Sequence, residues 1–263
     1  MICDTHIHFY DRQYPAAPAA VLRPPDASIV DYQQVQQTLD LDRVVVVQPT
    51  TYGLDNTCQL EAVAEIGPTA RAVVVIDAAT ATPATLEELT RLGVRGARFH
   101  MLPGGAVGWD ELEPVAAAIA PFGWHIQIQL NGHELGERLE RLVSLPCGLV
   151  VDHIGRFMPP VEPETPAFAA LLALVAAGAH VKLSAPYESA NDPQHRYETV
   201  STCVNALVST APDRLLWATN WPHPGQSDPP DPETLRRLRD RWLPTEALRH
   251  QVLVENPSAL YEF

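Results

Sequence analysis

The feature that most constrains the fold is an alternation of short apolar runs with longer amphipathic segments along all 263 residues. Arg43–Gln48 is the clearest run, because four consecutive valines suit a strand that is covered on both faces. The other runs of this kind are residues 2–9, Arg71–Ile76, Gly96–Met101, Trp124–Leu130, Gly148–His153, His180–Ser184 and Arg214–Asn220. The pattern therefore predicts eight strands.

A segment with helical spacing of apolar residues follows each predicted strand. These segments are Ile29–Leu39, Thr57–Ile66, Pro83–Leu92, Glu111–Ala120, Gly136–Val143, Ala167–Ala177, Tyr197–Ser209 and Pro232–Trp242. Strands that alternate with helices pair in parallel, and eight such units in about 250 residues are typical of a closed (β/α)8 TIM barrel of the α/β class. An open doubly wound sheet usually begins with a glycine-rich turn, but the first strand here ends in histidines. Because we find no linker, we predict a single domain over residues 1–263.

The charge of the chain excludes some partners. It carries 32 acidic and 18 basic residues, for a net charge of -14, and such a chain repels nucleic acid and anionic membranes. A small anionic substrate needs only a local cluster of Arg and His. No apolar run reaches the roughly 20 residues that span a bilayer. The four cysteines are scattered and the N-terminus lacks a signal-peptide pattern, so we expect a cytoplasmic protein with reduced thiols.

Polar residues collect where the predicted strands end. In a parallel barrel these carboxyl ends meet at one face, and active sites lie there. The residues are His6, His8, Gln48, Thr50, Asp77, Arg98, His100, Gln127, Gln129, Asp152, His153, Lys182, Ser184, Thr219 and Asn220. Burying such groups is costly unless they serve a purpose, so we predict a functional site at this face. Two proline-rich stretches, Tyr14–Asp26 and Pro159–Pro166, are expected to form loops around it.

Three short motifs carry the strongest chemical signal. Residues two apart on a strand point the same way, so His6 and His8 should project together into the mouth of the barrel. Two such imidazoles suit metal binding or proton transfer. His153 ends the sixth strand, and the neighbouring Asp152 either orients another group or caps the turn. Asn220 lies in the third motif, residues 217–224, at the end of the eighth strand.

These motifs, in this order, resemble the amidohydrolase superfamily. The resemblance is narrowest to the amidohydrolase-2 branch, which contains the D-galactarolactone isomerase and 2-pyrone-4,6-dicarboxylate hydrolase families. It extends over DTHIHFYD, VVVVQPTTYGLDN, GARFHMLPGGAV, VVDHIGRF, KLSAPYES, ATNWPHP and VENPSALYEF. It implies a barrel enzyme that acts on a carboxylated sugar lactone, and the LPGGAV, YES and TNWPH stretches favour the isomerase family.

The resemblance also assigns residues. His6 and His8 match the histidine pair of the first strand, His153 matches the histidine of the sixth, and Asn220 stands where many members carry Asp. Where metal-dependent relatives place a fifth-strand histidine, this chain offers Gln127 and Gln129; His125 lies at the start of that strand. An Asn is neither an anionic ligand nor a base that activates water. We therefore predict no metal; the alternative is one zinc ion at His6, His8 and His153.

A lactone isomerase moves an ester between two hydroxyl groups of one molecule, so no water needs to be activated. We predict five catalytic residues: His6, His8, Arg98, His153 and Asn220. His8 or His153 takes the proton of the attacking hydroxyl, and Arg98 with His6 stabilises the oxyanion. Asn220 binds substrate or orients a histidine. Predicted substrate contacts are Gln48, Thr50, Tyr52, Gln129, Tyr187 and His223. Lactone hydrolysis, with or without zinc, and sugar-acid binding without turnover remain open, and the oligomeric state is not indicated.

Overall fold

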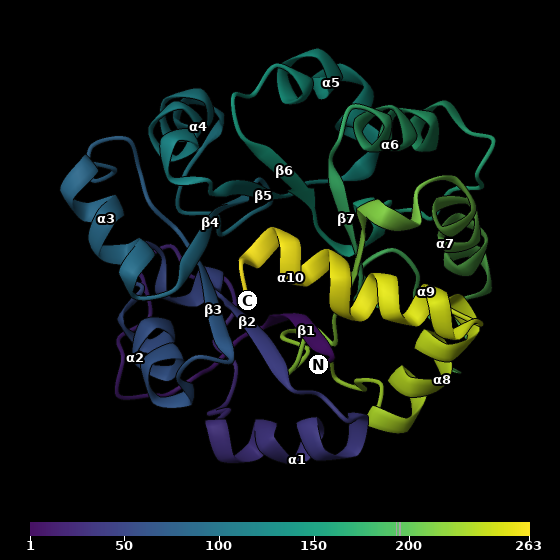
Figure 1. The fold of residues 1–263 in the computed structure, drawn as a ribbon, viewed down its shortest axis with the longest axis horizontal. Coiled ribbons are helices and arrows are strands. Elements are labelled where there is room, and N and C mark those ends of the chain that lie inside the picture. The colour runs from purple at the N-terminus through teal and green to yellow at the C-terminus, as the bar shows by residue number, and fades with distance from the viewer. Residues whose placement is uncertain (193, 195) are drawn as a thin grey trace.

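The structure is a computed structural model that describes residues 1–192, 194 and 196–263. Its centre is one parallel sheet in the order β1 to β8. The strands are β1 (Cys3–Ile7), β2 (Arg43–Val47), β3 (Ala70–Val74), β4 (Val94–His100), β5 (His125–Gln129), β6 (Gly148–Val151), β7 (His180–Leu183) and β8 (Leu215–Trp217). The ring closes where Ile7 bridges to Trp221 and the Asn220 N–H donates to the His6 carbonyl over 3.0 Å. The predicted (β/α)8 barrel is confirmed (Figure 1).

Helices surround this barrel and follow the strands in turn (Figure 1). They are α1 (Ile29–Leu39), α2 (Thr57–Ile66), α3 (Pro83–Arg91), α4 (Leu112–Ile119), α5 (Leu135–Val143), α6 (Pro166–Ala176), α7 (Glu198–Thr210) and α8 (Pro232–Trp242). Local sequence explains several of their starts. Ser28 forms a capping box with Asp31 at α1, and Thr82, Thr165 and Asp231 each accept a backbone N–H and precede a proline in the first turn.

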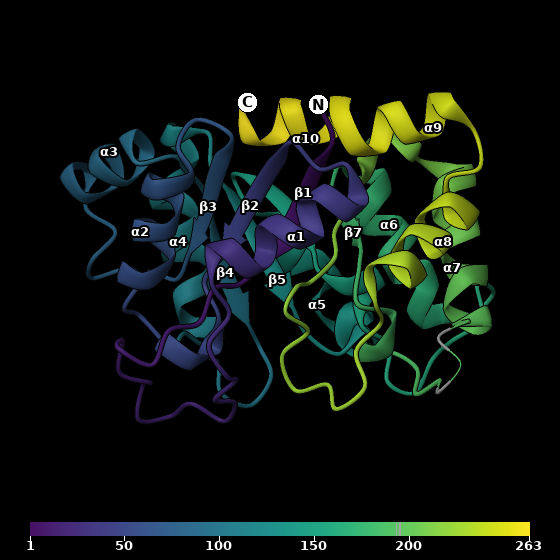
Figure 2. The ribbon, with the colours of Figure 1, turned by 90° about the horizontal axis from the view of Figure 1, so that it is seen from below.

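The chain ends in a helical segment that the alternation did not predict. It comprises α9 (Glu246–His250), a π-helical turn at Gln251–Glu255 and α10 (Asn256–Tyr261). This segment lies across one end of the barrel together with both termini, and the long loops lie at the opposite end (Figure 2). Asn256 donates to the carbonyl of Leu215 at the start of β8, and Arg71 of β3 donates to the Tyr261 carbonyl. The segment therefore covers the amino ends of the strands, and the carboxyl ends remain for a site.

The barrel interior contains an apolar cluster that packs against Tyr261 of the C-terminal segment. It consists of Cys3, Val45, Val47, Val73, Val150, Leu216 and Tyr261. Toward the carboxyl ends of the strands, buried polar side chains replace it, among them His6, Gln127, Asp152 and Lys182. In β1, the side chain of Asp4 faces outward and that of His6 faces inward, and the register of the strand shifts between Asp4 and Ile7. Asp4 bonds to Tyr32 of α1, on the outside of the sheet, whereas His6 contacts the interior residue Lys182.

Gly96 of β4 makes room for a histidine inside the barrel. His125 of β5 is buried, and a Cβ atom on Gly96 would lie 2.7 Å from its Nε2. The paired register of Gly96 with His125 places the two residues side by side. His125 also packs edge-on against Tyr261, with 5.3 Å between ring centroids. The position therefore has no space for a side chain.

We expect Gly96→Ala to lower the free energy of unfolding by about 1–3 kcal/mol, because the methyl group would force apart a packed barrel layer. Gly136→Ala is the matched control: its Cβ would meet no atom within 4 Å, and it lies in α5, where Ala is favoured by up to about 1 kcal/mol. Urea unfolding of the two variants measures both values. Equal stability of the two variants would contradict this account of the barrel.

Candidate active site

A small cavity lies at the carboxyl ends of the strands. It has a volume of about 60 Å³ and is lined by His8, Tyr10, Leu22, Pro49, Thr50, Arg98, His100, Gln129, His153, Glu188, Asn220 and Pro224. Of the predicted catalytic residues, His8, Arg98, His153 and Asn220 reach this lining, as do the predicted contacts Thr50 and Gln129. His6 is completely buried and in contact with His8. The structure thus brings the five predicted catalytic residues together around one cavity.

His6 and His8 project to the same side of β1, and their Nε2 atoms are 3.3 Å apart. The Nδ1 atom of His8 lies 2.7 Å from the carbonyl oxygen of Val47. A carbonyl can only accept, so this Nδ1 carries the proton and the Nε2 of His8 has a free electron pair. Burial lowers the pKa of His8 to about 3 and that of His6 well below its ordinary value, so both rings are neutral at pH 7.

Beneath the histidines lies a buried charged network whose residues the sequence analysis placed at this face but did not include among the catalytic or substrate-binding residues. Lys182 of β7 is completely buried, and its Nζ donates to the carbonyl of Thr5 and to Oε1 of Gln127, both over 2.7 Å. The Nε2 of Gln127 donates to Asp152 over 3.1 Å, and Asp152 Oδ1 is 3.3 Å from Nδ1 of His6. Of the two roles open to Asp152, the structure favours orienting a neighbour over capping the turn. Burial lowers the pKa of Lys182 to about 8.

Arg98 provides a fixed positive charge at the cavity. Its Nη1 donates to the Gln48 carbonyl and its Nη2 to Oε1 of Gln129, each over 2.8 Å. Its Nε is 4.0 Å from Asp152 and has no hydrogen-bond partner in the part of the chain that the structure describes. Burial lowers the pKa of Arg98, opposed by Asp152, but a guanidinium remains charged in proteins. The side chain is therefore held rigidly beside the cavity.

His153 follows β6 in the left-handed region, with φ at 54°. Its Nδ1 lies 2.9 Å from the hydroxyl oxygen of Ser184, which follows β7. Its Nε2 has no hydrogen-bond partner among the described residues. Burial lowers the pKa of His153 well below its ordinary value, so the ring is neutral and can accept a proton.

Asn220 follows β8 and is also left-handed, with φ at 62°. Its Nδ2 donates to the hydroxyl of Tyr187 over 2.8 Å, and that hydroxyl lies 2.9 Å from Nδ1 of His223. These contacts fix the amide, so its Oδ1 is the atom left over, buried and unpartnered within the described chain. Non-glycine residues with positive φ cost energy and gather at functional sites, as His153 and Asn220 do here.

The four other predicted substrate contacts lie outside the lining of the mouth cavity. Tyr187 and His223 support Asn220 from behind and are absent from the lining. Gln48 and Tyr52 also lie outside it: Gln48 Nε2 donates to the carbonyls of Gly53 and Asp55, and the Tyr52 hydroxyl bonds to the backbone of Asp11. Both side chains hold loops around the mouth. Direct contact of these four with a substrate stays a prediction.

Sequence reasoning missed several lining residues. Glu188 forms an ion pair with Arg156 over 2.9 Å, and Tyr10 and Leu22 enter from the loop after β1. Glu188 lies in the YES stretch and Leu22 in the proline-rich Tyr14–Asp26 loop, so the segments were recognised as significant. The individual residues carried no signal, because the approach of a loop to the mouth depends on its three-dimensional path.

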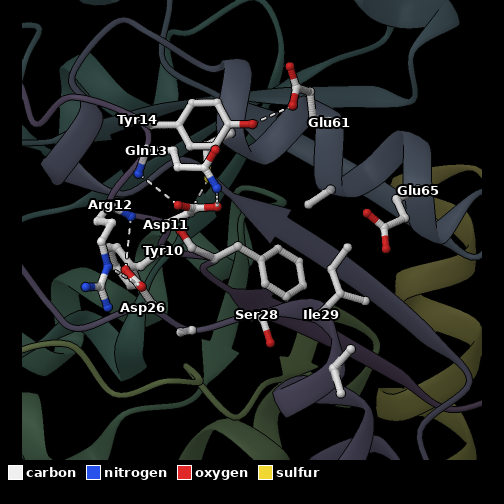
Figure 3. Close-up of a pocket in the computed structure, with 15 residues that line it drawn as sticks. Tyr10, Asp11, Arg12, Gln13, Tyr14, Asp26, Ser28, Ile29, Glu61 and Glu65 are labelled. Carbon is white, nitrogen blue, oxygen red and sulfur yellow. Dashed lines mark hydrogen bonds and ion pairs between the residues drawn. The ribbon is translucent and has the colours of Figure 1, made fainter.

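A larger pocket of about 490 Å³ lies outside the mouth, between the loop after β1 and helices α1 and α2 (Figure 3). It shares only Tyr10 with the lining of the mouth cavity. The acidic side chains Asp11, Asp26, Glu61 and Glu65 line it, with Arg12 paired to Asp26 over 2.7 Å. An anionic ligand would be repelled there, so the mouth cavity is the better candidate for the active site.

Three residues form a group that could hold a metal ion. Within the described residues, ligand atoms of His6, Asp152 and His153 all lie within 4.8 Å of one another. This group differs from the alternative zinc set of His6, His8 and His153, because it contains a carboxylate. The sequence analysis did not consider Asp152 as a ligand, but this carboxylate is buried beside His6.

Comparison with known proteins agrees with this geometry. Residues 3–263 match the amidohydrolase family model, Amidohydro_2. The chain belongs to the amidohydrolase family. It is 39% identical to a D-galactarolactone isomerase of Agrobacterium fabrum, over 98% of this chain and 90% of that protein. It is 33% identical to a 2-pyrone-4,6-dicarboxylate hydrolase of Comamonas testosteroni, over 98% of this chain and 89% of that protein.

A solved structure supports the same assignment to the amidohydrolase family. A protein of Agrobacterium tumefaciens, crystallised in its apo form, superimposes with a TM-score of 0.93 at 39% identity, covering 100% of this chain and 96% of that one. The expected resemblance to the amidohydrolase-2 branch is confirmed.

In the described part of the chain, no helix has both the length and the apolar character needed to cross a bilayer.

The buried histidines of this amidohydrolase make its stability depend on pH. Burial lowers the pKa of His125 to about 3, against about 6.5 in an unfolded chain. Its contribution is therefore fully present above pH 6.5 and is lost as pH falls toward 3, at up to about 1.4 kcal/mol per pH unit. Urea unfolding at a series of pH values should give a shallower pH slope for His125→Met than for the native chain. An unchanged slope would show that this imidazole takes up its proton at the same pH in the folded and the unfolded chain.

Proposed function

We propose that this amidohydrolase isomerises a carboxylated sugar lactone, as the D-galactarolactone isomerase it resembles is named to do. The observation that carries the proposal is Asn220. Its neutral amide lines the mouth cavity and leaves one oxygen unpartnered, at a position where a carboxylate would activate water. A neutral acceptor there can bind a substrate hydroxyl without generating hydroxide.

Proton transfer falls to His153 in this proposal. The ring is neutral, its Nδ1 is occupied by Ser184, and its Nε2 remains for the attacking hydroxyl. The proton passes to Nε2 as the hydroxyl oxygen attacks the lactone carbonyl, and it returns to the ring oxygen that leaves. Arg98 stabilises the oxyanion formed between these steps. The ester has then moved from one hydroxyl to another with no net gain of water.

The small size of the mouth cavity supports transfer within one molecule. Its volume is about 60 Å³, so little space remains for bulk water beside a bound substrate. Leu22 of the loop after β1 and Pro224 of the loop after β8 also line the cavity. A lactone that fills this space shields the reaction intermediate from bulk water.

A zinc ion fits this set of residues poorly. The only carboxylate of the group, Asp152, already has Lys182 Nζ at 3.9 Å and Arg98 Nε at 4.0 Å. A divalent ion between these cations would be repelled by both. The proposed reaction therefore uses no metal.

Hydrolysis is the second candidate, and Glu188 favours it. This carboxylate lines the mouth cavity and is held by Arg156. It could activate a water molecule if one enters beside the bound lactone. The 2-pyrone-4,6-dicarboxylate hydrolase named above is a relative with this type of activity.

The two reactions separate in oxygen-18 water. We expect D-galactarolactone to be converted to its ring isomer with no label in the product, because the attacking oxygen belongs to the substrate. An equal sample hydrolysed by alkali controls for label incorporation. Mass spectrometry of an open diacid that carries one labelled oxygen would identify the protein as a hydrolase instead.

Asn220→Asp tests the residue that carries the proposal. A carboxylate at the mouth should activate water, so we expect hydrolysis to rise and isomerisation to fall by at least about tenfold, or about 1.4 kcal/mol in the barrier. Asn205→Asp makes the same change at an exposed position of α7 and is expected to leave both rates unchanged. An unaltered ratio of the two products in Asn220→Asp would remove Asn220 from the mechanism.

A further inference from the structure

Lys182 is the single lysine of this chain, in which the other basic side chains are arginines. It is completely buried inside the barrel, where an ammonium group pays a large desolvation penalty. Replacing a whole buried ion pair with apolar residues often leaves a protein as stable or more stable. A stabilising role therefore does not explain why this position holds a lysine.

The surroundings of Lys182 match the three protons of an ammonium group. Two go to the Thr5 carbonyl and to Oε1 of Gln127, and the third faces Nδ1 of His6 at 3.5 Å. Because Gln127 accepts from Lys182 through its oxygen, its Nε2 is turned toward Asp152 and lies 3.4 Å from the same His6 nitrogen. Two donors thus face Nδ1 of His6.

The donor and the acceptor of each remaining hydrogen bond can then be assigned. If Nδ1 of His6 accepts, the proton of its neutral ring is on Nε2. His8 donates from Nδ1 to the Val47 carbonyl, so its Nε2 accepts from His6 across 3.3 Å. Asp152 Oδ1 is 3.3 Å from Nδ1 of His6 but receives no hydrogen bond within the described chain. The chain of donors therefore runs from Lys182 through His6 and His8 to Val47.

We propose that Lys182 is a positioning residue that holds His6 in its Nε2-protonated form and thereby closes the His6–His8 pair to a metal ion. The Nε2 atoms of His6 and His8 are then hydrogen-bonded to each other. A nitrogen that carries a proton cannot ligate zinc, and the electron pair of His8 is occupied. For the reaction proposed above, on which this step rests, His153 is left as the imidazole with a free Nε2 at the cavity.

The opposite arrangement shows what Lys182 prevents. Without its ammonium group, the proton of His6 can move to Nδ1 and bond to Asp152, the carboxylate–histidine pairing common in zinc sites. Two free Nε2 atoms would then face each other at 3.3 Å. Tetrahedral zinc with bonds of about 2.0–2.1 Å holds two nitrogens about 3.4 Å apart. One side chain thus separates a metal-free pair of histidines from a metal site.

The first test reads the protonation of His6 directly. In protein labelled with ¹⁵N-histidine, we expect Nε2 of His6 and Nδ1 of His8 to carry protons at pH 7.5; the signals are assigned by their loss in His6→Gln and His8→Gln. Labelling with ¹⁵N-lysine yields one side-chain signal, which we expect to exchange slowly with water. A proton on Nδ1 of His6 in the native protein would overturn the proposal, and this measurement needs no folded variant of Lys182.

The second test measures zinc binding by equilibrium dialysis. Lys182→Met keeps the volume of the side chain, and we expect it to bind one zinc ion at least tenfold more tightly than the native protein. His125→Met, which also removes a polar group from the barrel interior, is the matched control and should show no gain. The double variant Lys182→Met with Asp152→Asn should lose the gain. Equal zinc affinity of Lys182→Met and the native protein would overturn the proposal.

These readouts need no substrate, so they remain valid if the isomerase proposal fails. Conversely, oxygen-18 incorporation would overturn isomerisation and leave the His6 protonation unaffected. Where the isomerase proposal holds, Lys182→Met should lower kcat by about 10- to 100-fold, the range for losing a partner that orients an active-site histidine. His125→Met should not produce this loss.

Discussion

The compensation of buried charge inside the barrel is the constraint on which the site depends. Asp152, Lys182 and Arg98 are all buried, and the two cations lie 3.9 and 4.0 Å from the carboxylate. Isolated charges would be too costly there, but each of these has a counter-charge and hydrogen bonds. Gln127 links Lys182 to Asp152 through both ends of its amide. The histidines of β1 inherit their orientation from this arrangement.

The barrel supplies the geometry that the charges need. Parallel strands end at one face, so residues from β1, β4, β6 and β8 meet there although they are far apart in the chain. At His153, Ala185 and Asn220 the backbone is left-handed directly after or close to a strand end. On the outer side of the sheet, Asp4 accepts hydrogen bonds from Thr219 and Tyr32 and so links β1 to the residues after β8 and to α1. These backbone conformations and hydrogen bonds position the predicted catalytic side chains at the mouth.

The architecture could be predicted from the sequence because the alternation of strand and helix is repeated eight times, and each repeat favours the same barrel fold. The pairing of His6 with His8 also followed from strand periodicity alone. Lys182 and Asp152 appeared as strand-end residues, but nothing local distinguishes an interior lysine from a solvent-facing one. Their partners belong to other strands, so the network depends on barrel register. The C-terminal segment Glu246–Tyr261 was missed because no strand accompanies it.

The net charge of -14 and a preference for an anion are compatible once burial is considered. Charges on the outer helices are screened by salt over about 8 Å, whereas charges in the dry interior are screened much less. The buried histidines at the mouth are neutral, because burial lowers the pKa of His8, His100 and His153. Arg98 and Lys182 contribute two positive charges and Asp152 one negative charge. The Glu188–Arg156 ion pair at the mouth is neutral overall, so the sum is one net positive charge. This charge favours the proposed carboxylated substrate even though the molecule as a whole is acidic.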